Sequence, residues 1–334
     1  MKPRIGVVLG DPCGIGPELV AKLVADKSVR KRALIAVVGD KRIFAKGAEI
    51  ARLANDIPVA SKAGELSATD ESPLILDLPP LDPEAFALGE VSTEAGRWQL
   101  DCLEETINLV GDGKLDGMCF APLNKDAMHR AGLKHEDEQG FFADVLGHTG
   151  TMGLMNTVGK MWTSRVTSHV AHKRVSQLIT VDSILNAVRI ADQTMRQAGY
   201  KNPRLAIAGL NPHAGDGGNF GDEEIRVITP AVKAAAGEGI AVGGPYPADT
   251  IFLKIRDGEY DAVVTMYHDQ GQIAMKLMGF DSGVTVHAGL PFPITTSAHG
   301  SAFDIAGKGV ANVEALKQAF MIVCDMVESK SERR

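Results

Sequence analysis

Short apolar runs alternate along the chain with longer segments of helical periodicity. Seven such runs predict strands, because near-continuous apolar runs between helices are typical of a sheet that is buried on both faces. They are RIGVVLG (4–10), ALIAVVG (33–39), PLILDL (73–78), GMCFAPL (117–123), RLAIAGL (204–210), AVVTMYHD (262–269) and GVTVHAGL (283–290).

Two of the intervening segments repeat apolar residues every three or four positions, which is the spacing of the buried face of a helix. The repeating residues are Leu100, Leu103, Ile107 and Val110 in one segment, and Ile184, Val188, Ala191 and Met195 in the other. Gly199 can end the second helix with a left-handed cap. Strands that alternate with helices predict an α/β fold, here with a mixed sheet.

Length and composition narrow the class of protein. A chain of 334 residues is longer than one hydrophobic core usually serves, so we expect two domains. The net charge of −7 and the absence of a Lys/Arg cluster argue against nucleic acid or an anionic membrane as partner. Asp11 interrupts the first apolar run too early for a signal peptide, and no apolar run is long enough to span a membrane. We therefore expect a cytoplasmic protein.

The four cysteines are scattered along the chain without CxxC spacing, so neither a zinc knuckle nor a disulfide framework is indicated. Cys13 lies in a glycine-rich turn. A nucleophile would need a basic neighbour to lower the pKa of its thiol, and the sequence places none beside it. We interpret Cys13 as a small residue in a tight turn.

Three of the nine histidines follow strand-like runs: His169 in SRVTSHVAH, His213 in GLNPHAG and His268 in TMYHDQG. Neutral imidazole binds zinc and other first-row divalent metals, and three imidazoles leave coordination positions open for a substrate. Residues at strand ends can converge on one site although they are far apart in sequence. Taken alone, each histidine is better explained as an ordinary loop residue. Three histidines in similar surroundings favour a metal site more strongly, although spacing does not prove convergence.

Acidic residues near these segments suggest two roles. Asp249 in GPYPADTIF follows two prolines that fix the backbone, and its carboxylate could orient a ligand or take a proton. Asp222, Glu223 and Glu224 precede a helical segment, where we interpret them as first-turn residues that complement the helix dipole.

Two glycine-rich loops indicate a nucleotide. VLGDPCGIGPELVAKL reads as strand, turn and helix, with Gly10, Gly14 and Gly16 in place of the GxGxxG fingerprint. Such a turn lets the backbone approach a ligand at the start of a helix. The second loop, AHGSAFDIAGKGVAN, covers residues 298–312. Its Asp304 could accept hydrogen bonds from the ribose hydroxyls of an adenosine, and His299 could stack on a base.

The two loops resemble GDGIGPE and HGSAPDIAGKGIAN of isopropylmalate and isocitrate dehydrogenases, which bind their metal through aspartates. The chain resembles more closely the 4-hydroxythreonine-4-phosphate dehydrogenase (PdxA) family of pyridoxine biosynthesis, and over nearly its whole length. The shared motifs are GDPCGIGPE, APLNKDAMHRAG, GHT, TSH, GLNPHAGDGG, FGDEE, GPYPADT, MYHDQG, KLMGF, GLPF and HGSAFDIAGKG. NPHAG together with MYHDQG is specific to that family.

The resemblance implies an isopropylmalate-dehydrogenase-like fold of two domains with an active-site cleft between them. Residues 1–130 with 290–334 would form the cofactor-side domain, and residues 131–289 the metal, substrate and dimerisation domain. It also implies a homodimer in which His169, His213 and His268 bind a divalent metal, one of them from the partner chain.

The resemblance also implies residues for the other ligands. The substrate-binding positions are His148, Thr149, Lys276, Thr285 and Ile294. The positions for NAD are Gly10, Asp11, His299, Gly300, Ser301, Asp304 and Asn312. Asp249 and Lys276 are the two candidates for catalytic proton transfer, and the sequence does not choose between them. NAD is expected rather than NADP because the Asp304 carboxylate would repel a 2′-phosphate.

The chain departs from the family at positions that hold the substrate. Thr285 replaces an Asn of the family pattern, Ile294 replaces an Arg, and Gly150 follows the GHT motif in place of Glu. Arg suits bidentate binding of phosphate, whereas Ile has no donor. His287 could substitute as a donor, or it could be a histidine of the core. The departure leaves open whether the substrate is phosphorylated.

These features predict an NAD-dependent oxidation of a 3-hydroxy acid with β-decarboxylation, assisted by zinc, cobalt, manganese or magnesium. The best-matching substrate is 4-phosphohydroxythreonine or a close analogue. The alternative is a catabolic dehydrogenase of an unphosphorylated substrate, such as a cis-dihydrodiol carboxylate, which the Ile at position 294 favours. A non-catalytic dimeric binding protein is a third hypothesis, against which the histidine trio and the HGSA loop argue.

Overall fold

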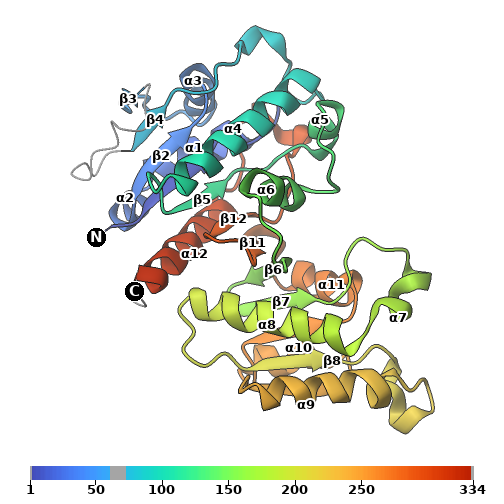
Figure 1. Ribbon diagram of the computed structural model, residues 1–334. Helices are drawn as coiled ribbons and strands as arrows, with labels where there is room; N and C mark the ends of the chain where they lie inside the picture. The colour runs from blue at the N-terminus through green and yellow to red at the C-terminus, as the bar shows by residue number, and fades with distance from the viewer. Residues whose placement is uncertain (1, 61–72, 332–334) are drawn as a thin grey trace. The chain divides into compact units, whose positions relative to one another are not determined.

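The computed structural model describes residues 2–60 and 73–331 and divides into two compact units (Figure 1). The first unit comprises residues 1–149 and 290–334, and the second comprises residues 150–289. The sequence-based division gave residues 131–149 to the second unit, whereas the structure keeps them in the first. The reason is Phe142 on α6 (Glu138–Leu146), which packs edge-on against Phe120 of β5 (Gly117–Phe120) with ring centroids 5.8 Å apart.

The sheet of the first unit is parallel in every pairing that the described residues show. Its strands run in the order β3-β4-β2-β1-β5-β12. They are β1 (Arg4–Val8), β2 (Leu34–Val38), β3 (Val59–Ala60), β4 (Leu74–Leu76), β5 and β12 (Ile294–Ser297). The central strands β1, β2 and β5 are almost wholly buried, as expected of a parallel sheet covered on both faces.

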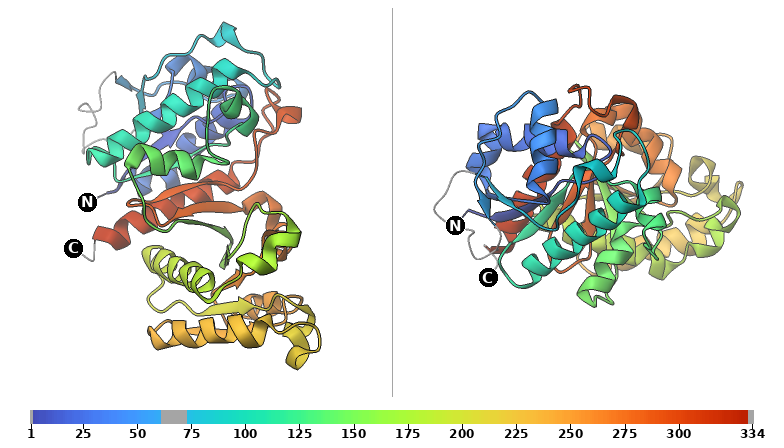
Figure 2. Two further views of the ribbon diagram at one scale, coloured as in Figure 1. Left: turned by 45° about the vertical axis from the view of Figure 1, so that its right-hand side comes forward. Right: turned by 90° about the horizontal axis from the view of Figure 1, so that it is seen from above.

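Helices cover both faces of this sheet (Figure 2). One group is α1 (Gly16–Ala25), α2 (Lys27–Arg32), α3 (Lys41–Ile50) and α12 (Glu314–Ser331), and the other is α4 (Thr93–Gly111), α5 (Lys125–Arg130) and α6. The predicted apolar stripe lies on α4, where Leu100, Leu103 and Ile107 are buried. Ser92 caps α4 by accepting a hydrogen bond from the Ala95 amide.

The sheet of the second unit is mixed, with strands in the order β11-β6-β7-β10-β8-β9. They are β6 (Gly153–Val158), β7 (Met161–Arg165), β8 (Leu205–Ala208), β9 (Val242–Tyr246), β10 (Ala262–Thr265) and β11 (Val284–Ala288). β6 pairs antiparallel with β11 and β7. β7, β10, β8 and β9 are consecutive parallel neighbours, so their carboxyl ends share one edge.

Helices of the second unit also lie on both faces of its sheet (Figure 1). α8 (Val181–Gln197) and α9 (Thr229–Gly237) cover one face, and α10 (Ile251–Arg256) and α11 (His268–Gly279) cover the other; α7 (Val175–Leu178) is a single turn. α8 buries the predicted stripe that includes Ile184, Val188 and Met195. Within the described parts of the chain, no helix has the length and apolar character needed to cross a membrane.

Candidate active site

Four predicted residues follow neighbouring strands of the second unit. His169 follows β7, His268 follows β10 and His213 follows β8. Asp249 follows β9 in the turn that leads into α10. Since these strands are consecutive parallel neighbours, their carboxyl ends lie at one edge of the sheet, where α/β proteins bind ligands. The fold therefore brings residues that are far apart in sequence to a common edge.

Two of the three histidines lie side by side. The imidazole rings of His169 and His268 have centroids 5.6 Å apart and planes tilted by 48°. His268 is the first residue of α11, and its Nδ1 lies 2.7 Å from the carboxylate of Asp269. Such a contact fixes the orientation and tautomer of an imidazole and makes Nε2 the atom that can bind a metal.

His213 lies in a turn of left-handed backbone. The residues from His213 to Gly217 all have positive φ, at 54°, 52°, 81°, 45° and 68°. Three of these residues are not glycine: His213, Ala214 and Asp216. Each such residue costs about 1–2 kcal/mol, and strain of this kind persists only where the surroundings impose it. The surrounding structure therefore imposes this conformation on the turn that carries His213, whose side chain is exposed.

The carboxylate of Glu224 holds this turn in place. Glu224 is 3% exposed. One of its oxygens accepts the backbone N–H groups of Leu210 and Asn211, both at 2.7 Å, and the other accepts Asn211 Nδ2 at 2.9 Å. A Cβ at Gly215 would come within 2.7 Å of the same carboxylate, so only glycine fits there. The interpretation of Glu224 as a first-turn dipole residue missed this role.

The donor chemistry of the histidine pair fits a divalent metal ion. Among residues 2–60 and 73–331, no three His, Cys, Asp or Glu side chains are grouped so that they could hold an ion. His213 packs instead against the ring of Phe220, with centroids 6.1 Å apart. A complete site thus needs at least one ligand beyond the His169–His268 pair.

The two candidates for proton transfer are both exposed to solvent. Asp249 lies in the turn between β9 and α10. Lys276 lies on α11, two turns after His268. Either group can exchange a proton with a ligand or with water, so the structure keeps both candidates.

In the first unit, two glycine-rich loops pack against each other where β1 and β12 end. The Ile15 amide donates to the Ser301 carbonyl at 3.0 Å. A Cβ at Gly14 would lie 2.5 Å from the same carbonyl oxygen. Gly10 has φ of 73°, and a Cβ there would lie 2.6 Å from the Pro122 carbonyl oxygen. Close approach of these backbones therefore requires glycine at both positions.

Asp11 and Cys13 are buried within the first of these loops. Asp11 is 1% exposed and its carboxylate accepts the Cys13 N–H at 3.0 Å, so it shapes the turn. Burial raises the pKa of the Asp11 carboxyl and raises the pKa of the Cys13 thiol to about 12. A thiol with that pKa is protonated at neutral pH, which agrees with the interpretation of Cys13 as a turn residue.

The second loop, in which the sequence predicts a cofactor site, has both exposed and buried groups. Asp304 is exposed, and its backbone carbonyl accepts Lys308 Nζ at 2.6 Å. A side chain at Gly300 would meet nothing within 4 Å. His299 is half-buried and Ser301 is 8% exposed. Asn312 Oδ1 accepts the Glu314 N–H at 3.0 Å and so caps α12.

Glu18 and Lys22 of α1 hold the far end of this loop. The Glu18 carboxylate, 2% exposed, accepts the Ala311 N–H at 2.9 Å and Lys22 Nζ at 2.7 Å. Lys22 Nζ also donates to the carbonyls of Gly309 and Ala311 at 3.1 and 2.8 Å. The charged pair thus fixes three backbone groups of the loop. The sequence offered no signal for this contact beyond the i, i+4 spacing of the pair.

The predicted substrate residues have contrasting surroundings. His148 is half-buried after α6, and its Nε2 is buried without a hydrogen-bond partner among the described residues. Thr149 beside it is exposed. Thr285 is half-buried on β11, whereas Ile294 on β12 is 0% exposed. His287 is 2% exposed within β11, which places it in the interior of the sheet and not at a surface that a ligand can reach.

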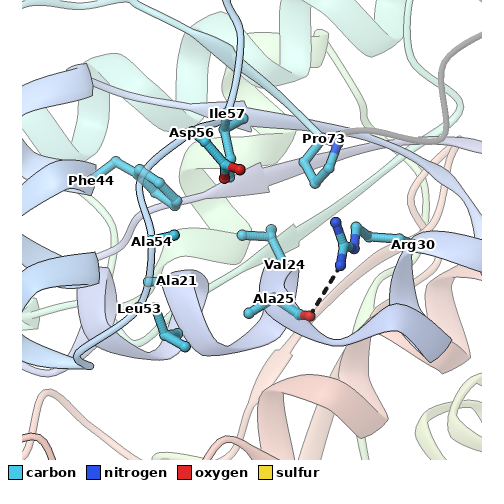
Figure 3. Close-up of a pocket in the computed structure, with 10 residues that line it drawn as sticks. All are labelled: Ala21, Val24, Ala25, Arg30, Phe44, Leu53, Ala54, Asp56, Ile57 and Pro73. Atoms are coloured by element: carbon cyan, nitrogen blue, oxygen red, sulfur yellow. Dashed lines mark hydrogen bonds between the residues drawn. The ribbon is translucent and has the colours of Figure 1, made fainter.

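Two cavities of the first unit contain none of the predicted site residues. One, of about 280 Å³, has apolar walls from Val24, Phe44 and Leu53, with Arg30 and Asp56 at its sides (Figure 3). The other, of about 380 Å³, lies between α4 and the end of α12. Most of the predicted site residues lie instead on loops at strand ends, whereas Lys276 lies on α11, Thr285 on β11 and Ile294 on β12.

A model of the PdxA family, described as pyridoxal phosphate biosynthetic protein PdxA, matches residues 31–323. A Pseudomonas aeruginosa protein provisionally named 4-hydroxythreonine-4-phosphate dehydrogenase 2 is 47% identical over 331 residues, which cover 98% of each chain. The D-threonate 4-phosphate dehydrogenase of Salmonella typhimurium is 37% identical over 320 residues, which cover 93% of this chain and 95% of that one.

The same likeness extends to three dimensions. A crystal structure of 4-hydroxythreonine-4-phosphate dehydrogenase from Klebsiella pneumoniae superimposes with a TM-score of 0.85 at 34% identity, covering 98% of both chains. The agreement covers both units and confirms the predicted two-domain α/β fold.

Proposed function

The chain belongs to the PdxA family, and from that premise we propose that it is a dehydrogenase that oxidises a secondary hydroxyl of a phosphorylated hydroxy acid. The observation that carries the proposal is the common edge of four parallel strands at which His169, His268, His213 and Asp249 stand. Relatives named as dehydrogenases of 4-hydroxythreonine-4-phosphate and D-threonate 4-phosphate support the substrate class.

The second unit would hold a divalent metal. His169 and His268 are its first ligands, and Asp269 orients the His268 ring. The Glu224 carboxylate fixes the turn that offers His213. A bound ion would polarise the substrate hydroxyl and stabilise negative charge on the oxygen during the reaction. The metal can be zinc, cobalt, manganese or magnesium.

The first unit would hold NAD. The loop of residues 298–312 offers the exposed Asp304 carboxylate to the ribose hydroxyls, and His299 and Gly300 lie where a base can approach. Gly10 and Gly14 let the first loop pack beneath it, while Asp11 and Ser301 shape the turn from inside. Asn312 would act through the start of α12, which it caps.

The reaction would begin with loss of the hydroxyl proton, which Asp249 or Lys276 accepts. NAD held by the loop of residues 298–312 would supply the hydride acceptor that this oxidation needs, so that the hydroxyl could become a carbonyl. The resulting β-keto acid loses carbon dioxide, its C–C bonding pair forms an enolate, and a proton returns to carbon from the same groups. His148 and Thr149 would hold the substrate during these steps.

A second copy of the chain would complete the metal site. The two described histidines that lie together leave the ligand set short of one imidazole. α11 also exposes large apolar side chains beside Lys276: Ile273 is 60% exposed and Leu277 83% exposed. Contiguous exposed apolar residues on a helix are typical of a subunit interface. We therefore include a homodimer in the proposal.

An unphosphorylated substrate remains the second candidate, because Ile294 is buried and has no donor for a phosphate. NADH formation should be measured with 4-phosphohydroxythreonine, with D-threonate 4-phosphate and with the same acids lacking phosphate, each with and without a chelator. Chelator-sensitive turnover of a phosphate ester is expected. Turnover of the unphosphorylated acids alone would move the protein to the second candidate, and no turnover of any member would reject the proposal.

A further inference from the structure

A phosphorylated substrate requires a cationic partner. This inference rests on the proposed function, because that function includes the phosphate of the substrate. Ile294 cannot be the partner, since its side chain is 0% exposed in β12. Thr285 offers only a neutral hydroxyl. His287 is 2% exposed. The second unit, however, holds a guanidinium beside Thr285 that the sequence did not single out.

A cluster of four polar side chains centres on Asn156 of β6. Asn156 is 6% exposed and stands opposite Thr285 of β11 in the strand register, and its Nδ2 donates to Thr285 Oγ1 at 2.9 Å. Its Oδ1 accepts Arg165 Nη1 at 2.8 Å and Gln272 Nε2 at 2.6 Å. Strands β11, β6 and β7 and helix α11 thus each contribute one member (Figure 1).

Arg165 is oriented by neutral groups on two sides. Besides Nη1 on Asn156, its Nε donates to Ser168 Oγ at 3.0 Å. These two hydrogen bonds fix the direction of the guanidinium. Arg165 is half-buried and ends β7, and Ser168 directly precedes His169. The cation therefore stands at the strand end that carries one of the proposed metal ligands.

We propose that Arg165 binds the phosphate of the substrate, from the cluster that includes Thr285, and so replaces the Arg that position 294 lacks. A guanidinium matches a phosphate bidentately and keeps its charge at every physiological pH. Lys276, also assigned to the substrate, is a flexible point charge on the exposed face of α11 and can act on the carboxylate end. Arg165 is a specificity residue in this account, because it binds the phosphate, which takes no part in the oxidation, and so favours substrates that carry one.

The test compares Arg165→Met and Arg165→Lys with the wild-type dimer, loaded with metal. Arg256→Met is the matched control: its guanidinium is 60% exposed on α10 and bonds to the adjacent Asp257. Steady-state rates are measured for the phosphorylated substrate and for the same acid without phosphate, and thermal unfolding and metal content are recorded for each variant. The binding of inorganic phosphate is measured by calorimetry, independently of turnover.

For Arg165→Met, KM for the phosphorylated substrate should rise between about 10- and 150-fold, the range for a lost hydrogen bond to a charged group. KM for the unphosphorylated acid, kcat and metal content should stay within about threefold of the wild-type values, because a substitution that removes no contact to this acid has only a small effect. Inorganic phosphate should bind correspondingly more weakly. KM of Arg165→Lys for the phosphorylated substrate should fall between the values of wild type and Arg165→Met. Arg256→Met should match wild type.

An equal loss for both substrates would overturn the assignment, because Arg165 would then act on the carboxylate or on the fold. Unchanged KM and unchanged phosphate binding in both variants would also overturn it. If Arg165→Met does not fold, Arg165→Lys decides. Should wild type turn over no phosphate ester, the proposed function fails separately, while calorimetry with inorganic phosphate still accepts or rejects the role of Arg165.

Discussion

In the proposed function, the preference between NAD and NADP depends on Asp304. Its carboxylate is exposed in the loop of residues 298–312, where it can accept ribose hydroxyls and repel a 2′-phosphate. Asp304→Asn should raise the NADP-to-NAD ratio of kcat/KM at least about tenfold. The control is Asp112→Asn, an exposed carboxylate beside Lys114 in the same unit. An unchanged ratio in Asp304→Asn would remove Asp304 from the cofactor site.

At this scale the sequence predicts residues whose chemistry is visible in a motif. The histidines, Asp249 and Asp304 are of that kind. Glu224 and Arg165 are not, because their roles depend on burial and on partners more than ten positions away or on other strands. Glu18 is a further example, since it accepts a hydrogen bond from Ala311, at the opposite end of the first unit's sequence. No local pattern specifies such pairs.

The left-handed turn from His213 to Gly217 is the element that the sequence describes least well. Glycines in GLNPHAGDGG suggest positive φ, but the three non-glycine residues in the same conformation follow only from the structure. Glu224→Gln replaces one acceptor oxygen with a donor facing backbone N–H groups. It should lower the free energy of unfolding by about 1–3 kcal/mol and weaken metal binding, because the turn would no longer hold His213. Calorimetric titration with Co²⁺ and thermal unfolding measure the two effects.

The matched control for that substitution is its neighbour. Glu223→Gln alters a half-buried carboxylate that accepts Asn211 Nδ2, away from the backbone amides of the turn. It should leave the affinity for Co²⁺ near that of wild type. Wild-type affinity in Glu224→Gln, or an equal loss in both variants, would contradict the role given to Glu224.

Strands with continuous apolar runs were predictable, and so were the helices α4 and α8, which have a regular apolar stripe. The seven predicted strands are β1, β2, β4, β5, β8, β10 and β11. The sequence did not predict β6 and β7 as strands, because buried polar residues such as Asn156, Thr163 and Ser164 interrupt their apolar runs. β9, VGGPY, has two glycines and a proline, which weaken strand propensity. Its hydrogen bonds to β8 hold it in the sheet.

At the scale of the whole molecule, the border between the units shows the limit of sequence reasoning. Residues 131–149 join the first unit through the contact of Phe142 with Phe120, which no local pattern reveals. The exposed fractions of Leu277 (83%) and Ile273 (60%) support the dimer interface that we propose on α11.

The central claim is a single metal site to which His169, His213 and His268 contribute from two subunits. It is tested most directly by co-expressing pairs of differently tagged, singly inactive variants, His169→Ala, His213→Ala and His268→Ala, and purifying each heterodimer through both tags. If two ligands come from one subunit and the third from its partner, a heterodimer keeps one intact site when its two substitutions affect ligands from opposite sides. Such a heterodimer should have about half of the wild-type turnover and metal content. Two of the three pairings should be active and the third inactive. Three inactive heterodimers, beside an active wild type, would contradict the claim.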